Sequence, residues 1–481
     1  SEIEGASVRR SFFDFPRNKV IRQNLLEKLG AFGPEYFGGE NMNKKTDNLL
    51  ELLVDKKRFS LRLLLEGLAV GLGAGISISV FRYLLAGSEV LRPVIYHNLR
   101  EALADGQWQW LALYILSFII IAYLLKLIVA REPMCTGSGI PQIKGVLQGD
   151  MSMRWFSVLW SKIIGGVLAI GAGMSLGREG PSVQIGACVG QGLSQTSRRT
   201  RFESRILMTA GAGAGLAAAF NAPLAGVIFG LEEMQKTISP ALLLTGITAS
   251  ITAATVTEVV FGMSPVFSMG YLLPLPLNLF DVLVVAGIVI GLLGRLFNIA
   301  LAYSLNTYSR LGLSGMKKPL VPLALAGILG FVLPEILGGG NLLVDSLVVT
   351  DYTIGFLCLL FVGKFLFTMI CFGSGVPGGI FLPMLVLGAA GGAVLAKLLV
   401  MAGLLPAMYY ADIIVFGMAA YFSAVVKSPV TGSILILEMT GSFQHMLALL
   451  VVSLTAYVIS DLTGGRPVYD ELLDRALGKS K

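Results

Sequence analysis

PLAGVIFGLE at residues 223–232 and PVTGSILILE at residues 429–438 share the pattern P-x-x-G-x4-L-E, with an offset of 206 residues. Upstream of each decapeptide the pattern P-x4-G-x3-G begins at Pro181 and again at Pro383, with an offset of 202 residues. Two ordered matches at nearly one offset predict an internal repeat with one half at residues 59–265 and the other at 266–465. The sequence does not distinguish parallel from inverted halves, although an inverted pair is favoured if the function is transport.

The composition indicates a membrane protein. Of 481 residues 54% are hydrophobic and only 14% are charged, whereas an ordinary soluble domain carries roughly a quarter charged residues. This excludes a soluble enzyme, a disordered chain and a nucleic-acid-binding domain as first hypotheses. Several apolar runs approach the ~20 residues that span a bilayer, namely Leu61–Ala86, Trp108–Ala130, Trp155–Met174, Leu242–Phe261, Leu279–Leu305, Leu320–Leu337, Tyr352–Phe372 and Leu447–Leu462.

Other apolar runs are shorter or interrupted by glycine and proline, and the chain holds 58 glycines. We therefore predict an all-α polytopic membrane protein of tilted, partly broken helices. Repeated halves with broken helices place a binding site near the membrane midplane, where the halves meet.

The polar ends of the chain are predicted to be cytoplasmic. Residues 1–58 form a polar extension with possible amphipathic helices at 18–29 and 46–57, and residues 466–481 form a short terminal helix. The net charge of +7 gathers partly in basic clusters at segment ends, as expected for loops on the cytoplasmic side.

Three glycine-rich breaks carry the predicted chemistry: GSGIP at 137–141, GREGP at 177–181 and GVPGGIFLP at 375–383. Each combines glycine with a proline suited to the first turn of a helix. Each can therefore open a helix inside the membrane, and a helix N-terminus binds anions through its unpaired N–H groups and partial positive charge. The alternative is that each break is only a structural kink.

Glu179 lies inside the second break. A carboxylate within the membrane costs ~2.5–3.5 kcal/mol or more and indicates a functional site. Ionised Glu179 would occupy the anion site itself; protonated, it would lose its charge and swing away. The alternative is a static salt bridge to Arg178.

Other polar side chains are weaker candidates. Either Glu232 or Glu233 could pass protons from the aqueous side, or both are exposed acids at a helix end. Ser138 offers a hydroxyl to an anion or caps a helix. Tyr469 offers another hydroxyl or is an interfacial aromatic residue. Lys162 attracts the anion or pairs with a carboxylate.

Cysteine and histidine are too few for most enzyme chemistry. The four cysteines have no metal-binding spacing and suggest no disulfide framework. An intramembrane serine protease using Ser138 would need a histidine base, and the two histidines, His97 and His445, do not lie in clear apolar spans. We expect no metal and no cofactor.

The ordered set GSGIP, GREGP, AAAFNAPLAGVIFGLEE, GVPGGIFLP and GGRPVY resembles the CLC family of chloride channels and transporters, in particular its bacterial proton-coupled antiporters. The resemblance runs from about residue 60 to 478. It implies a homodimer in the bacterial inner membrane, in which each subunit has its own pore and two inverted halves.

The resemblance also implies roles for residues of this chain. Glu179 matches the external gating glutamate and Glu233 the internal proton-transfer glutamate. Chloride would be bound by the Ser138 and Tyr469 hydroxyls and by the N–H groups of Ile380 and Phe381. Supporting positions are Gly177, Arg178, Gly180, Pro181, Glu232 and Lys162.

The expected function is exchange of chloride for protons, with chloride as the transported ligand. A passive chloride channel of the same fold is the alternative, and Glu233 argues against it because pure channels in the family usually carry an apolar residue there. A fluoride exporter of the same family is less well matched, because Ser138 and Glu233 depart from what that branch is expected to carry.

Overall fold

The computed structural model describes residues 61–267, 269–270 and 272–479. The extension predicted for residues 1–58, with its two amphipathic helices, lies outside this part. All named elements in the described part are helices, and its only bridged extended backbone is two isolated pairs of residues. The prediction of an all-α protein is confirmed.

The first predicted half contains ten elements. In chain order they are α3 (Leu61–Ala104), α4 (Gln109–Arg131), η2 (Pro133–Cys135), α5 (Ile140–Gln148), α6 (Trp155–Gly171), α7 (Glu179–Thr196), α8 (Arg201–Phe220), α9 (Pro223–Phe229), the π-helical turn η3 (Gly230–Gln235) and α10 (Pro240–Phe261).

In the described residues the second predicted half again contains eight α-helices, with short turns among them, and a short helix follows it. The elements are η4 (Leu277–Leu279), α11 (Phe280–Arg310), α12 (Lys317–Val332), η5 (Pro334–Ile336), α13 (Asn341–Val349), α14 (Ile354–Gly373), α15 (Phe381–Met401), η6 (Ala407–Tyr409), α16 (Tyr410–Val426), α17 (Pro429–Thr440), η7 (Phe443–His445), α18 (Met446–Leu462) and α19 (Val468–Ala476).

Within the described residues, eight helices are long and apolar enough to cross a membrane. Two of them, Phe381–Met401 and Ala407–Val426, come from segments that the sequence presents as short or broken runs. Conversely, the run Trp155–Met174 forms a helix of only 17 residues. The polytopic prediction is confirmed, although the assignment of individual spans is partly wrong.

Two run boundaries also differ from the prediction. The first helix does not end near Ala86 but continues through Pro93 to Ala104. The run predicted to end at Leu337 breaks after Val332, where Leu333 leaves helical geometry ahead of Pro334. Proline disfavours the helical conformation in the residue before it, which explains this second break.

The repeated glycines bring helix backbones into contact. A Cβ atom on Gly186 of α7 would lie 2.1 Å from the carbonyl oxygen of Gly211 in α8. Its repeat partner Gly388 of α15 would place a Cβ atom 2.5 Å from the carbonyl oxygen of Gly417 in α16. Small residues permit such close packing inside membranes. The P-x4-G-x3-G pattern therefore marks one tightly packed helix pair in each half.

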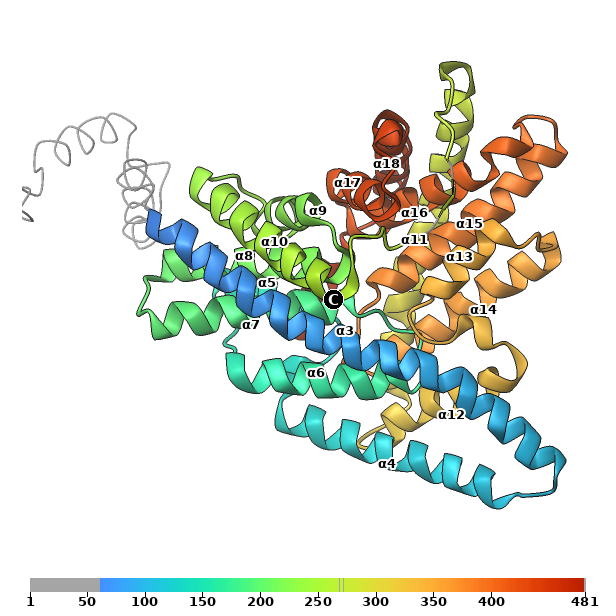
Figure 1. Ribbon diagram of the computed structural model, residues 1–481, viewed down its shortest axis with the longest axis horizontal. Coiled ribbons are helices and arrows are strands. Elements are labelled where there is room, and N and C mark those ends of the chain that lie inside the picture. Colours follow the sequence, from blue (N-terminus) through green and yellow to red (C-terminus); the bar gives the residue numbers. More distant parts are fainter. Residues whose placement is uncertain (1–60, 268, 271, 480–481) are drawn as a thin grey trace, which may run out of the picture. The chain divides into compact units, whose positions relative to one another are not determined.

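The repeated glutamates join the two halves. Helices α9 and α17 contact one another (Figure 1), and each begins with a proline. The Glu232 carboxylate accepts hydrogen bonds from the N–H groups of Val430 (3.3 Å) and Thr431 (2.7 Å) at the start of α17. Glu232 is therefore a half-buried acid that is hydrogen-bonded to the start of another helix.

Glu438, the equivalent acid on α17, caps the start of α9. Its carboxylate accepts hydrogen bonds from the N–H groups of Leu224 (3.0 Å) and Ala225 (2.8 Å) at the start of α9. Each half thus supplies the acid that satisfies free N–H groups of a helix in the other half, where negative charge is also favoured by the helix dipole.

Replacing Glu438 by Ala should lower the free energy of unfolding by about 0.5–2 kcal/mol, the range for loss of an N-terminal capping side chain. Glu232→Ala should cost a similar amount, because its carboxylate makes the equivalent bonds. Denaturant unfolding in detergent measures the change, with the exposed Glu335→Ala as control. Equal stability of all three variants would contradict the reciprocal capping.

Candidate anion and proton site

The three predicted breaks meet and hydrogen-bond to one another. The Gly137 N–H donates to the Val376 carbonyl (3.2 Å), and the Gly378 N–H donates back to the Gly137 carbonyl (3.0 Å). Gly177 and Gly379 exchange a pair of N–H to carbonyl bonds at 2.7 and 2.8 Å. Loops from both halves therefore form one junction of paired backbone.

Three helices begin at this junction: α5 at Ile140, α7 at Glu179 and α15 at Phe381. Gly139 precedes α5 in the left-handed conformation, with φ of 88°. A Cβ atom on Gly180 would lie 2.9 Å from Ser138, so glycine there lets α7 start against the Ser138 loop. The first N–H groups of each helix have no acceptor within that helix.

Glu179 lies at the N-terminus of a helix from the other half. Its side chain is fully buried, and its Oε2 accepts a hydrogen bond from the Leu382 N–H of α15 at 3.3 Å. Leu382 was not among the predicted site residues, although the second N–H of a helix is a known anion donor. A Cβ atom on Gly177 would lie 2.3 Å from this same oxygen, so glycine there leaves space for the carboxylate.

Arg178 is a distant partner of Glu179. Its Nε lies 3.9 Å from Glu179 Oε1, and neither atom has a hydrogen-bond partner in the described part of the chain. Pro181 is buried in the first turn of α7, where its missing N–H costs no helical bond. The Leu382 N–H of α15 is therefore the hydrogen-bond donor that another helix brings to the Glu179 side chain.

Three of the four predicted chloride-binding residues are buried at these helix starts, and all four are buried. Ile380 and Phe381 are fully buried and lie at the start of α15. Ser138 is 2% exposed, and its Oγ accepts a 3.4 Å hydrogen bond from the Ile140 N–H.

Tyr469, in the first turn of α19, is fully buried, so its interpretation as an interfacial aromatic residue is wrong. Its hydroxyl has no hydrogen-bond partner among the described residues. It directly precedes Asp470, whose carboxylate shares the Lys144 ammonium with Glu233.

Glu233 is buried in the π-helical turn η3, and π-turns are frequent at functional sites. Its Oε1 accepts a hydrogen bond from Lys144 Nζ at 2.8 Å, and its Oε2 accepts one from Ser428 Oγ at 2.9 Å. Neither partner was predicted. Met439 holds the equivalent position in the second half, so the acid is particular to the first half.

Lys162 contacts backbone rather than a carboxylate. Its fully buried ammonium donates to the carbonyls of Cys135 (2.8 Å) and Gly137 (2.7 Å). The alternative that it pairs with a carboxylate is wrong for the part of the chain that the structure describes. Lys364 of α14 makes the same contacts in the second half, to the carbonyls of Ile336 (2.9 Å) and Gly338 (2.7 Å).

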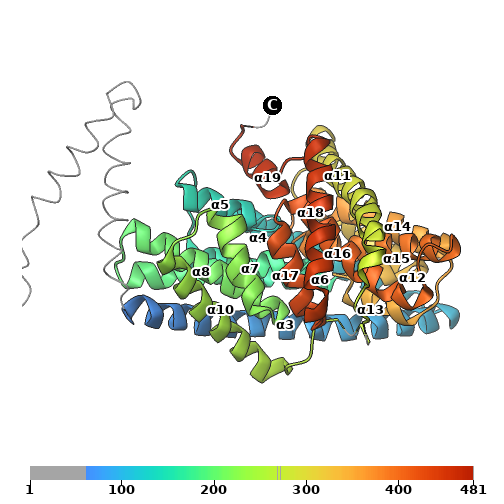
Figure 2. The same cartoon turned by 90° about the horizontal axis from the view of Figure 1, so that it is seen from above.

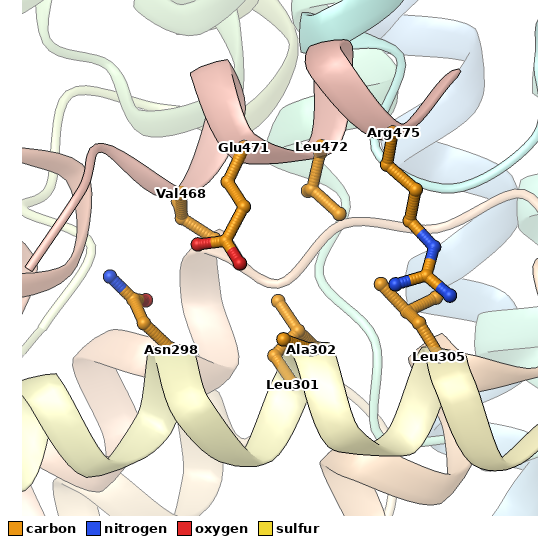
Figure 3. Close-up of a pocket in the computed structure, with 8 residues that line it drawn as sticks. All are labelled: Asn298, Leu301, Ala302, Leu305, Val468, Glu471, Leu472 and Arg475. Atoms are coloured by element: carbon orange, nitrogen blue, oxygen red, sulfur yellow. The ribbon is translucent and has the colours of Figure 1, made fainter. Parts of the chain in front are cut away.

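A small pocket elsewhere shows how α19 is seated. Figure 3 shows its lining side chains between α11 and α19, with Glu471 and Arg475 projecting from α19 toward α11. Beside it Asn298 donates hydrogen bonds to the carbonyls of Val425 (3.2 Å) and Arg466 (3.1 Å). In Figure 2, α19 lies on the opposite side of the described helices from α3. These contacts fix the helix that carries Tyr469.

The searched part of the chain contains no group of three or more metal-ligating side chains.

A family model described as voltage gated chloride channel matches residues 117–461 of this chain. An H(+)/Cl(-) exchange transporter ClcA from Vibrio cholerae serotype O1 is 34% identical over 455 residues, covering 91% of this chain and 94% of the relative. The transporter of the same name from Citrobacter koseri is 33% identical and covers 93% and 95%.

Solved structures agree with these sequences. A slow cyanobacterial Cl-/H+ antiporter matches with a TM-score of 0.81 and 33% identity, covering 88% of this chain and 99% of the other. A eukaryotic CLC transporter at 23% identity shares the fold, with a TM-score of 0.70 over 86% of this chain and 74% of the other. The protein belongs to the CLC family, the voltage-gated chloride channel family, as the sequence motifs predicted.

Proposed function

We propose that this chain exchanges chloride for protons across a membrane, and that Glu179 is both the gate and the proton carrier. The observation that carries the proposal is the hydrogen bond from the Leu382 N–H to the Glu179 carboxylate. An acid side chain there occupies the helix N-terminus that would otherwise receive an anion. The exchange transporters among the relatives support the same function.

The gate works by competition for one set of N–H groups. Ionised Glu179 is attracted to the partial positive charge at the start of α15 and excludes chloride. Protonation removes that attraction, so the side chain leaves. Chloride then binds the N–H groups of Ile380 and Phe381 and the hydroxyls of Ser138 and Tyr469. Because these donors carry no full charge, chloride can also leave.

Protons reach the gate from the other side of the site. Glu233 is buried beside Lys144 and Ser428, and a buried acid within a membrane protein is suited to a proton relay. We place Glu233 toward the cytoplasm, together with both chain ends, and assign the protein to the bacterial inner membrane.

The matched elements of residues 59–265 and 266–465 support two corresponding halves within one subunit. We propose that these halves are inverted, and that two such subunits form a homodimer with separate pores. Exchange of an anion for a proton moves charge in one sense, so the membrane potential contributes ~2.3 kcal/mol per charge per 100 mV.

The deciding experiment is reconstitution in liposomes with an imposed chloride gradient and a record of uphill proton movement. Proton movement against its gradient, driven by chloride, supports exchange. Chloride flux with no uphill proton movement, and a reversal potential that ignores pH, would instead identify a passive channel of the same fold.

Replacing Glu179 by Gln should abolish proton coupling and leave chloride flux insensitive to pH, because the neutral amide cannot ionise and reoccupy the start of α15. Liposome flux assays over a range of pH measure both effects. Intact pH-driven chloride uptake by this variant would remove Glu179 from the gate.

Glu233→Gln should stop proton movement while chloride still passes, because the variant keeps the anion site and loses the internal proton acceptor. The same liposomes report both ions. If the variant still pumps protons when driven by chloride, Glu233 is not in the proton pathway.

Lys162→Met should lower chloride turnover more than Lys364→Met, because the Lys162 ammonium holds the loop that leads to Ser138. Both variants should lose comparable stability, about 1–3 kcal/mol, since each strands two buried carbonyls. Lys364→Met is therefore the matched control. Equal loss of turnover at equal stability would show that Lys162 has no special role in the anion site.

A further inference from the structure

The Lys144 ammonium links three elements of the site. Lys144 lies on α5, which follows the Ser138 loop, and its side chain is only 2% exposed. It pairs with Glu233 of η3 at 2.8 Å and also with Asp470, the residue after Tyr469 in α19. One buried cation is therefore shared between two carboxylates.

Asp470 faces the aqueous side of this cluster. Its side chain is 25% exposed and accepts a second hydrogen bond, at 2.7 Å, from the exposed Lys236 at the end of η3. Burial alone would raise the pKa of Asp470, but the hydrogen bonds from Lys144 and Lys236 outweigh it and hold the pKa below its usual value. Asp470 therefore stays ionised near neutral pH and remains paired with the Lys144 ammonium.

The other polar groups near Glu233, namely Ser428, Glu232 and Tyr469, do not compete with it for the Lys144 ammonium as Asp470 does. Ser428 donates a neutral hydrogen bond to Glu233. Glu232 is turned to the start of α17, where its oxygens accept backbone N–H bonds. Tyr469 is a neutral phenol near neutral pH. Lys144 and Asp470 thus provide the charged contacts that set the electrostatics of Glu233.

We propose that Lys144 is a positioning residue for proton transfer, and that Asp470 tunes how readily Glu233 takes a proton by competing for the Lys144 ammonium. The inference rests on the proposed function, because it assigns a regulator to the proton acceptor named there. An opposite charge within contact distance favours the ionised carboxylate. Because the Lys144 ammonium is shared with Asp470, it stabilises the ionised Glu233 carboxylate less strongly. Glu233 therefore stays able to accept protons.

The sharing of the Lys144 ammonium predicts the direction in which each substitution moves the pH of proton uptake by Glu233. Asp470→Asn leaves the whole ammonium to Glu233, so proton uptake needs a lower pH. Lys144→Met removes the opposing charge, so Glu233 takes protons at a higher pH. In the Lys144→Met background, Asp470→Asn removes only the direct repulsion between the Asp470 and Glu233 carboxylates, so its acid shift should be smaller than in the wild-type background.

The test records chloride-driven proton flux in liposomes as a function of pH on the Glu233 side. We expect the midpoint of the profile to move by roughly one pH unit toward acid in Asp470→Asn and toward alkali in Lys144→Met, the size expected for one adjacent charge. Lys144→Arg keeps the charge and should restore the wild-type profile, which covers the case in which Lys144→Met does not fold.

Two controls separate this role from a general loss of structure. Lys427 is a second shielded lysine: its side chain is 5% exposed and pairs at 3.3 Å with Asp461. Asp461→Asn should therefore leave the pH profile of proton flux unmoved. Adding Asp470→Asn to Glu233→Gln should leave chloride flux as in Glu233→Gln alone, because Asp470 acts through Glu233 rather than through Tyr469.

The outcomes are distinct. A wild-type protein that exchanges both ions, with an unmoved profile in Asp470→Asn, overturns the inference alone. A full acid shift that persists without Lys144 also overturns it. A wild-type protein that passes chloride and moves no protons overturns the proposed function and this inference with it.

Discussion

The interior of a bilayer offers no water to an unpaired peptide group, and this constraint decides where the helices of this protein can break. The glycine-rich breaks are tolerated because they bond to one another, as Gly137 does with Val376 and Gly177 with Gly379. The pairing satisfies backbone groups within the loops, and three helices begin beside it at Ile140, Glu179 and Phe381. The same feature that makes the breaks stable therefore also leaves helix N-termini suited to the anion binding that we propose.

The charges of the site are arranged so that no ammonium ion competes for the anion. Lys162 is bound by two carbonyls, and Lys144 is held by two carboxylates. The start of α15 attracts negative charge through partial charges, which is compatible with release, and the Arg178 guanidinium adds a full positive charge 3.9 Å from Glu179 Oε1. The Glu179 carboxylate accepts a hydrogen bond from the Leu382 N–H of α15, a donor that a small anion could also use.

Much of this arrangement follows from local sequence. Glycine and proline at fixed spacing predicted the helix starts, and the recurring P-x-x-G-x4-L-E pattern predicted corresponding elements in two halves. The partners of the acids were not predictable, because Lys144 and Asp470 are 326 residues apart and no local pattern joins them. The π-helical turn at Glu233 was also missed, since its α-helical counterpart around Glu438 has the same L-E ending.

The exchange of capping acids between α9 and α17 has a consequence for biosynthesis. The acceptor of the Ala225 N–H is the Glu438 carboxylate, which lies 213 residues later in the chain. At roughly 5–20 residues per second, a ribosome needs about 10–40 s to supply it. Throughout that interval the first N–H groups of α9 lack the acceptor that they have in the finished fold, so the start of α9 reaches its final hydrogen bonding only after α17 has been made.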